Sequence, residues 1–398
     1  MAEAVIVDAV RTPGGKRNGK LAGWHPADLG AEVLTALAER NDLDPALVDD
    51  VIMGCVMQVG AQSLNVGRNA VLGAGWPETV PSTTIDRQCG SSQQSAHFAA
   101  QGVMSGAYDI AVAAGVEVMS MVPMGSSAMT PNTGFPFGDK MTARYDEVGG
   151  LVPQGISAEL IADKWDLSRE DLDTYAARSQ RLAEQATEEG RFDREIIPVQ
   201  ARPIDKETGK LIELDEMVTK DEGIRPGTTV ETLAKLKPAF KEDGKVTAGN
   251  SSQITDGASA VLIMSADKAD ELGLRPRARF HTFALAGVDP ITMLTGPIPA
   301  THKALERSGL SMDDIDLTEI NEAFASVVLA WEKELHPDMD KVNVNGGAIA
   351  LGHPLGCSGA KLMATLVHEL ERTGGRYGLQ TMCEGGGMAN ATIIERLD

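Results

Sequence analysis

Short apolar runs alternate with amphipathic helical patterns at both ends of the chain, and this alternation constrains the fold more than any other feature. In the first part of the chain the apolar runs lie at 4–10, 51–56, 81–87 and 110–114, with helical patterns at 26–39 and 90–104. After residue 249 the apolar runs return at 260–264, 278–284, 341–344 and 378–382. Because strands separated by helices need crossover connections, the pattern predicts an α/β fold with a buried, mostly parallel sheet.

The middle of the chain interrupts this alternation. Residues 119–150 are rich in Met, Pro, Gly and Ser and show no sustained period, and residues 193–243 are charged and broken by prolines. Two helices are expected between these stretches, the second beginning at a capping box formed by Ser168 and Asp171. We interpret 119–249 as an insertion over the sheet domains, and a separate linker domain is the alternative.

A weak internal repeat connects the two ends. Residues 105–115 and 373–383 each run from a glycine turn through a tyrosine into an apolar strand. Each repeat begins roughly 15–20 residues after a turn that carries a candidate reactive side chain, Cys89 in one case and His353 in the other. Two duplicated halves with their active-site turns facing each other would explain the repeat.

The charge balance excludes nucleic acid as a partner. The chain has 36 Lys+Arg against 57 Asp+Glu, a formal net charge of −21, and such an acidic surface repels a phosphate backbone.

Four cysteines in 398 residues do not make a disulfide framework and indicate thiols in a reducing compartment. The N-terminus lacks a basic signal region, and no run reaches the ~18 apolar residues of a membrane span. We therefore expect a soluble cytoplasmic protein without a membrane partner.

Cys89 is the first candidate reactive side chain. It stands in DRQCGSS at 86–92, between an apolar strand and a helix rich in small residues. A thiol at a helix N-terminus lies near unpaired N–H groups and the positive end of the helix dipole, which favour the thiolate and can hold an oxyanion. A buried, inert cysteine is the alternative. The order of strand, Cys, Gly and Ser favours a nucleophile.

His353 is the best candidate for a general base. It lies in NGGAIALGHPLGCSG at 345–359, where glycines on both sides allow the backbone to approach a ligand closely. A histidine that caps a tight turn is the alternative. The other histidines lack such a setting and are expected to be surface or satisfied core residues: His25, His97, His281, His302, His336 and His368.

Two further motifs place polar groups beside apolar segments. In CEGGGM at 383–388, Cys383 ends an apolar strand, and three consecutive glycines suggest N–H groups that line a pocket. In NEAF at 321–324, a polar pair interrupts apolar helical text. A loose turn and a helix cap are the respective alternatives. Because Cys-x-x-Cys, His-Glu-x-x-His and an early Gly-x-Gly-x-x-Gly are missing from the sequence, we expect neither a metal site nor a dinucleotide fold.

Together these four motifs resemble the thiolase family of acyl-CoA C-acetyltransferases. The resemblance runs from VRTP at 10–13 to the last glycines, GHPLGCSG at 352–359 is a highly specific signature, and DGASA at 256–260 also fits. It implies an α/β thiolase fold, in which two similar βαβαβαββ halves form a five-layered α-β-α-β-α arrangement with an inserted loop domain. The implied domains are an N-terminal half at 1–118 and 250–272, a loop domain covering CoA at 119–249, and a C-terminal half at 273–398.

The resemblance also implies catalytic roles. Cys89 would be the acylated nucleophile, and His353 would activate it. Cys383 would protonate the leaving enolate and later deprotonate the incoming CoA thiol. Asn321 would hold a water that forms one oxyanion hole with His353, and the N–H groups of Cys89 and Gly385 would form the other. Cleavage of a 3-ketoacyl-CoA suits such a set, because a thiolate gives a thioester that CoA can attack and two oxyanions need stabilising.

CoA and acyl-CoA are implied as substrates, with no permanently bound cofactor, and a homodimer or homotetramer is expected. The positions that match the family's CoA contacts are Arg225, Ala239, Phe240, Ala248, Ser252 and Ile254, with Ala323 and Phe324 near the pantetheine. The lysines that would add positive charge for the phosphates are Lys235, Lys237, Lys241 and Lys245. A solvated charged face is the alternative for most of these lysines.

Two departures from the family pattern bear on the reaction. Acetoacetyl-specific members carry His-Met-Gly before the helix that here starts near Ser157, whereas this chain has PQG at 153–155. This departure favours a broader, degradative 3-ketoacyl substrate. Glu384 stands where an apolar residue is commoner in the family, and it adds an acid beside Cys383.

We therefore predict a thiolase that cleaves 3-ketoacyl-CoA with CoA, by a ping-pong route through an acyl-Cys89 intermediate, in fatty-acid or related β-oxidation. Biosynthetic condensation of two acetyl-CoA to acetoacetyl-CoA is the alternative within the family. A non-catalytic acyl-CoA-binding protein is the alternative outside it, although the intact reactive side chains argue against a mere binder. A condensing enzyme of the ketosynthase type would be expected to use two His, or His and Asn, without a second thiol.

Overall fold

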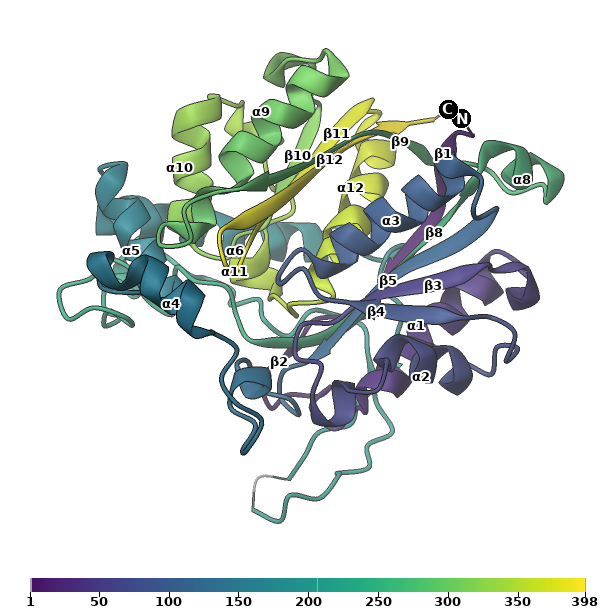
Figure 1. The fold of residues 1–398 in the computed structure, drawn as a ribbon, viewed down its shortest axis with the longest axis horizontal. Helices are drawn as coiled ribbons and strands as arrows, with labels where there is room; N and C mark the ends of the chain where they lie inside the picture. The colour runs from purple at the N-terminus through teal and green to yellow at the C-terminus, as the bar shows by residue number, and fades with distance from the viewer. Residues whose placement is uncertain (1, 206, 398) are drawn as a thin grey trace.

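A large mixed sheet forms the centre of the computed structural model, which describes residues 2–205 and 207–397 (Figure 1). The strands are β1 (Ala4–Arg11), β2 (Gly15–Lys16), β3 (Asp50–Gly54), β4 (Ser82–Ile85), β5 (Ile110–Val118), β6 (Val199–Gln200), β7 (Met217–Val218), β8 (Thr255–Ser265), β9 (Ala278–Gly287), β10 (Leu317–Ile320), β11 (Tyr377–Glu384) and β12 (Met388–Arg396). The α-helices are α1 (Pro26–Arg40), α2 (Val66–Gly73), α3 (Ser91–Ser105), α4 (Asp139–Tyr145), α5 (Gln154–Lys164), α6 (Arg169–Glu188), α7 (Val230–Leu233), α8 (Ala266–Glu271), α9 (Pro297–Ser308), α10 (Ala325–Leu335), α11 (Ala348–Leu351) and α12 (Ser358–Thr373).

The sheet consists of two halves that share an arrangement of four strands, to which the first half adds β4 at its edge. One half has the order β1-β8-β5-β3-β4 and the other has β9-β12-β11-β10. In each half the first two pairings are antiparallel and the next is parallel. The halves meet where β1 pairs with β9 at only Val5 and Ile6. The two similar halves that the sequence predicts are therefore confirmed.

Helices α3 and α12 lie between the two halves of the sheet (Figure 1). One apolar cluster joins Ala96 of α3 and Met363 of α12 to strand residues of both halves. The two helices approach closely, because a Cβ added at Gly359 of α12 would lie 2.1 Å from the backbone nitrogen of Gln93 in α3. Helices α1 and α2 cover the outer face of one half, and α9 and α10 cover that of the other. This is the predicted five-layered α-β-α-β-α arrangement.

The prediction of a mostly parallel sheet is wrong. β8 lies between β1 and β5 and runs antiparallel to both, and β12 does the same between β9 and β11. β12 was not among the predicted strands, and it follows β11 directly through the three glycines at 385–387. Two strands joined by so short a turn have to be antiparallel.

The apolar run at 341–344 is not the predicted strand. It makes only isolated parallel bridges, between Val342 and Thr318 and between Val344 and Gly346. Asn343 has a left-handed backbone, with φ of 47°. Its side chain accepts a hydrogen bond from the Ile320 N–H and donates one to the Ile320 carbonyl, each at 2.9 Å. The side chain thus takes the place of the backbone ladder of a strand.

Polar contacts fasten the inserted segment to the sheet. Arg11, at the end of β1, is fully buried and pairs with Glu195 at 2.5 Å and with Asp221 at 2.8 Å. The predicted capping box is confirmed, since Ser168 and Asp171 exchange hydrogen bonds at the start of α6. In the described part of the chain, no helix has the length and apolar character to cross a membrane.

Candidate active site

Cys89 lies on the turn between β4 and α3, as the sequence predicts. The preceding Gln88 has a left-handed backbone, with φ of 50°, which is uncommon outside glycine and is often found at functional sites. Ser91 closes the turn: its hydroxyl donates to the Gln88 carbonyl at 2.6 Å and accepts from the Arg87 N–H at 2.9 Å. The side chain of Cys89 is only 5% exposed. The turn therefore holds the thiol inside the protein, at the N-terminal end of α3.

The surroundings of the Cys89 thiol keep it neutral. Burial and then the charge of Glu384 raise its pKa to about 12, although the N–H groups of Cys89 and Gly385 and the side chain of Gln154 lower it. The predicted preference for a thiolate is therefore wrong for the resting protein, because desolvation outweighs the helix N-terminus. The structure does bring Cys89 and Gly385 together. Gln154 was not predicted to lie beside the thiol, and its only signal in the sequence is the unusual tripeptide at 153–155.

His353 lies in the loop before α12 and carries a lone pair on Nε2. Its Nδ1 is 2.5 Å from the hydroxyl of Ser358, and that hydroxyl donates to the Pro354 carbonyl at 2.9 Å. Because a hydroxyl has one hydrogen, Nδ1 is the donor to Ser358 and Nε2 remains the basic nitrogen. Nε2 lies 3.4 Å from the side-chain nitrogen of Asn321, so the structure brings these two predicted residues together.

Lys361 of α12 was not a candidate from sequence, yet it acts on His353 in two ways. Burial and the charge of Lys361 lower the pKa of His353 to about 3, so the ring is neutral near pH 7. The Lys361 ammonium also donates to the carbonyls of Leu351 and Gly352, at 2.8 and 3.1 Å. Gly352 has φ of 81°, and a Cβ there would lie 2.1 Å from the Thr255 hydroxyl oxygen. The segment leading into His353 is thus fixed from both sides.

Asn321 follows β10 and is held by backbone and side-chain contacts. Its N–H donates to the Thr381 carbonyl at 3.0 Å. The adjacent Glu322 is buried and accepts hydrogen bonds from the hydroxyls of Tyr175, at 2.8 Å, and Ser179, at 2.6 Å. No side-chain cap bond is present at the start of α10, so the helix-cap alternative for this motif is wrong. Glu322 instead anchors Asn321 to α6.

Cys383 and Glu384 are the last residues of β11, and both side chains are 0% exposed. Burial, followed by the charges of Cys89 and Glu384, raises the pKa of Cys383 well above its usual value. Burial also raises the pKa of Glu384 to about 8. Two neutral thiols and a neutral carboxyl therefore lie together at this end of the strand near pH 7.

Some of the predicted CoA-contact residues meet along one strip. The Ser252 N–H donates to the Ala323 carbonyl at 2.9 Å. The ring of Phe240 meets Phe324 edge-on, with 5.9 Å between ring centroids, and Phe240 is 43% exposed. Ile254 packs against the apolar cluster around the nucleophile. The strip thus connects the surface to the reactive thiol.

The other predicted CoA contacts lie on the surface of the insertion. Ala239 and Ala248 are exposed, and the Ala239 N–H donates to the Val246 carbonyl at 2.9 Å. Arg225 is also exposed, and its N–H donates to the Gln180 side chain at 2.8 Å. This hydrogen bond places Arg225 beside α6 and not beside the strip of Phe240, Ser252, Ile254, Ala323 and Phe324.

The four lysines predicted to face the CoA phosphates divide into two pairs. Lys241 and Lys245 pair with Asp163, at 3.8 and 2.9 Å. Lys235 and Lys237 are exposed. The exposed Lys235 and Lys237 fit the alternative of a solvated charged face, whereas Asp163 neutralises part of the charge of Lys241 and Lys245.

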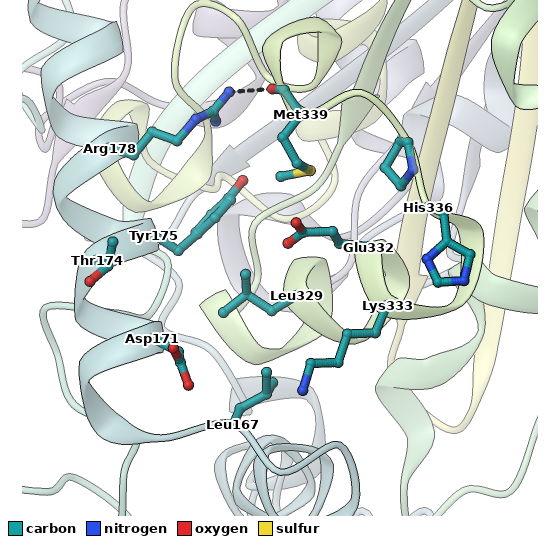
Figure 2. A pocket seen from close by; sticks show the side chains of 11 residues that line it. Leu167, Asp171, Thr174, Tyr175, Arg178, Leu329, Glu332, Lys333, His336 and Met339 are labelled. Carbon is teal, nitrogen blue, oxygen red and sulfur yellow. Dashed lines mark hydrogen bonds between the residues drawn. The ribbon is translucent and has the colours of Figure 1, made fainter.

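A cavity of about 830 Å³ lies between α6 and α10 (Figure 2). The candidate catalytic residues do not line it: Cys89, Asn321, His353 and Cys383. Its lining includes Asp171, Arg178, Glu332 and Lys333, so it carries charges of both signs. Tyr175 also lines it, and its hydroxyl reaches Glu322 beside the candidate site. Within residues 2–205 and 207–397, no group of three or more His, Cys, Asp or Glu is placed to hold a metal ion.

Sequence models of known families match both halves of the chain. The thiolase N-terminal domain matches residues 4–267, and the thiolase C-terminal domain matches residues 274–396. The chain belongs to the thiolase family. Both matches agree with the duplicated sheet, in which the turn carrying Cys89 and the loop carrying His353 precede the paired central helices α3 and α12.

Curated relatives of this thiolase match it over its full length. It is 53% identical over 401 residues to the steroid 3-ketoacyl-CoA thiolase FadA6 of Mycobacterium tuberculosis, covering 100% of this chain and 95% of the relative. It is 46% identical over 397 residues to the 3-ketoacyl-CoA thiolase of Bacillus subtilis, covering 99% of this chain and 100% of the relative.

Solved structures also resemble this thiolase over their whole length. The acetyl-CoA acetyltransferase of Bacillus anthracis superposes with a TM-score of 0.89 at 41% identity, covering 100% of this chain and 99% of the other. The human mitochondrial 3-ketoacyl-CoA thiolase superposes with a TM-score of 0.87 at 38% identity, with the same coverage.

Proposed function

We propose that this thiolase cleaves 3-ketoacyl-CoA with CoA, giving acetyl-CoA and an acyl-CoA shortened by two carbons, in β-oxidation of fatty acids or related compounds. The observation that carries the proposal is the buried Cys89 thiol, which faces the N–H groups of Cys89 and Gly385 with a second thiol, Cys383, close by. The names of the relatives from Mycobacterium tuberculosis and Bacillus subtilis support the direction of cleavage. The tripeptide at 153–155 supports it as well.

The first half of the reaction is acylation of the nucleophile. Cys89 attacks the 3-keto carbon of the substrate and passes its proton to Nε2 of His353, which the neighbouring Ser358 leaves free to accept it. Once protonated, Nε2 becomes a donor and, with a water held by Asn321, stabilises the enolate oxygen of the departing acetyl-CoA. The N–H groups of Cys89 and Gly385 hold the oxygen of the attacked carbonyl.

The first half ends as the C–C bond breaks: Cys383 donates its proton to the carbon of the enolate, and acetyl-CoA leaves an acyl-Cys89 thioester behind. The second half returns every group to its starting state. The Cys383 thiolate then takes the proton of the incoming CoA thiol, and the CoA sulfur attacks the acyl-Cys89 thioester. The Cys89 thiolate that leaves takes back the proton held by His353. The two half-reactions give ping-pong kinetics.

We also propose how CoA reaches the thiol. The exposed edge of Phe240 and the strip of Ser252, Ile254, Ala323 and Phe324 receive the pantetheine, and Arg225, Ala239 and Ala248 contact the rest of CoA. The loop domain at 119–249 would then cover CoA, between an N-terminal half at 1–118 and 250–272 and a C-terminal half at 273–398. A cytoplasmic location and a homodimeric or homotetrameric assembly stay predictions.

A panel of 3-ketoacyl-CoA substrates tests the proposed direction and substrate class. Thiolysis of acetoacetyl-CoA is compared with that of a linear medium-chain and a ring-bearing 3-ketoacyl-CoA; the ring-bearing arm is included because one relative is named a steroid 3-ketoacyl-CoA thiolase. We expect kcat/KM for at least one longer substrate to exceed that for acetoacetyl-CoA by about tenfold. Activity confined to acetoacetyl-CoA would contradict the degradative proposal and favour synthesis.

A further inference from the structure

A buried carboxyl group lies beside both thiols without a hydrogen-bond partner. Glu384 directly follows Cys383 and is 0% exposed, and neither of its carboxylate oxygens has a partner among the residues that the structure describes. Glu117, another buried carboxylate, accepts hydrogen bonds from the N–H groups of Val56 and Gly356, both at 2.9 Å. These donors stabilise the charged form of Glu117, although burial still raises its pKa. Glu384 has no donors to offset the cost of burying its charge, which favours its neutral form.

The Glu384 side chain lies against the turn that carries the nucleophile. A Cβ added at Gly90 would lie 2.1 Å from Oε1 of Glu384 and 2.8 Å from the side-chain nitrogen of Asn390. Gly90 follows Cys89 directly, and Asn390 donates to its carbonyl at 3.1 Å. Only glycine at position 90 leaves room for the carboxyl, so the charge state of Glu384 acts at the backbone of the Cys89 turn.

The charged and titratable groups that face Glu384 come from the loop before α3 and from its own strand. The loop contributes Arg87, Asp86 and Cys89, and β11 contributes Cys383. Burial has the largest effect on the pKa of Glu384 and raises it; the charge of Arg87 lowers it and that of Asp86 raises it again, which leaves it at about 8. The carboxyl therefore changes charge within the range where a thiolase is assayed.

We propose that Glu384 is a positioning residue that governs the nucleophile through its charge: its neutral form permits a thiolate at Cys89, and its ionised form suppresses it and so sets the alkaline limit of Cys89 reactivity. The inference rests on the proposed role of Cys89. The reaction places a negative charge in this pocket at successive steps, on Cys89 when it attacks or leaves and on Cys383 after it protonates the enolate. A second negative charge in the same water-excluded space opposes each of these steps.

Alkylation of Cys89 by iodoacetamide tests the inference without any acyl-CoA. Rates are measured from about pH 6 to about pH 9.5 in the wild type, E384Q and E384M, with mass spectrometry locating the label on Cys89. In the wild type we expect the rise of the rate with pH to flatten near pH 8 as Glu384 ionises. The ratio of variant to wild-type rate should stay constant below about pH 7 and rise about tenfold by about pH 9.5.

The matched control is E319Q. Glu319 is also buried, on the neighbouring strand β10, but the charged groups that face it are Glu322, Glu195, Glu369 and Lys361 rather than the thiols. The ratio of the E319Q rate to the wild-type rate should therefore stay flat with pH. A flat ratio in both E384Q and E384M would overturn the inference. The apolar E384M keeps the test valid if the buried amide of E384Q disturbs folding. Failure of the proposed function shows separately, as thiolysis that survives loss of the Cys89 thiol.

Discussion

A cysteine that burial keeps protonated can attack only if its proton has a destination inside the site. The pKa of Cys89 is raised to about 12, and that of His353 is lowered to about 3, so both groups are neutral at rest. Cys89 alone is therefore a poor nucleophile. The substrate has to supply what the resting protein lacks, namely an oxygen on which negative charge can develop beside the N–H groups of Cys89 and Gly385.

Replacement of the nucleophile gives the most direct check of the reaction route. C89S should lower thiolysis by several orders of magnitude while CoA binding is retained, because a serine hydroxyl is far less acidic than a thiol. Intact mass after mixing with acyl-CoA should show an acyl adduct on the wild type and none on C89S. C55S makes the same change at another buried cysteine and should keep both the adduct and turnover. Near-normal thiolysis in C89S would overturn the acyl-Cys89 route and revive the acyl-CoA-binding alternative.

The loop that carries His353 depends on a glycine in a left-handed conformation. In G352A the added Cβ would strain a φ of 81° and lie 2.1 Å from the Thr255 hydroxyl oxygen. We expect a loss of about 1–3 kcal/mol in the free energy of unfolding, and a fall in kcat of about tenfold or more as His353 shifts. G374A is the matched control: φ there is 74°, but nothing lies within 4 Å, so it should lose about 1 kcal/mol and keep its kcat. Equal kcat values in the two variants would show that the loop tolerates displacement.

Local periodicity predicted most helices and strands but not how they pair. The apolar runs that became β1, β5 and β11 were visible, and so was the Ser168 capping box. A run of apolar residues does not indicate in which direction a strand runs relative to its neighbours. The antiparallel pairing of β8 and β12 could therefore not be predicted from such runs. The strand predicted at 341–344 does not form because the Asn343 side chain takes the place of the backbone hydrogen bonds, and hydrophobic periodicity carries no information about such a contact.

The reactive residues were easier to predict than their neighbours. Cys89 and His353 stand in glycine-rich motifs whose composition alone is informative. Gln154 acts on Cys89 from α5, which only the packing of the fold brings close, whereas Lys361 acts on His353 from α12, the helix that follows the His353 loop. The direction of a pKa shift was equally hidden: a helix N-terminus is visible in sequence, whereas the burial that outweighs it at Cys89 depends on the folded structure.

The two halves of the sheet and the insertion over them form one body, and Arg11 is one of the points that hold it together. Its guanidinium is fully buried between Glu195 and Asp221, two residues of the insertion. Asp221 also accepts from the Gly14 N–H at 2.6 Å, so it ties the insertion to the chain that leaves β1. Loss of Arg11 would leave buried carboxylates without their cation, which costs far more than the pair contributes when complete.

R11M should therefore lower the free energy of unfolding by about 3–5 kcal/mol, measured by urea denaturation near pH 7. R279M is the control, because Arg279 is 38% exposed, its partner Glu3 is 43% exposed, and its buried partner Glu395 still pairs with Arg376. The expected loss is below about 1 kcal/mol. Equal losses in the two variants would contradict the role of the buried cluster.

The pH dependence of R11M separates the missing charge from the missing packing. Burial raises the pKa of Asp221, but the charges of Arg11 and Lys361 and the hydrogen bonds to the carboxylate together lower it by more. The net shift of the pKa is therefore downward. A carboxylate with a lowered folded pKa stabilises the protein above its unfolded pKa, about 4, and this stability is lost as the pH falls through the folded value. In R11M burial dominates, the pKa of Asp221 rises, and the acid-unfolding midpoint should move to higher pH. An unchanged midpoint beside a lowered stability near pH 7 would assign the effect of Arg11 to its packing alone.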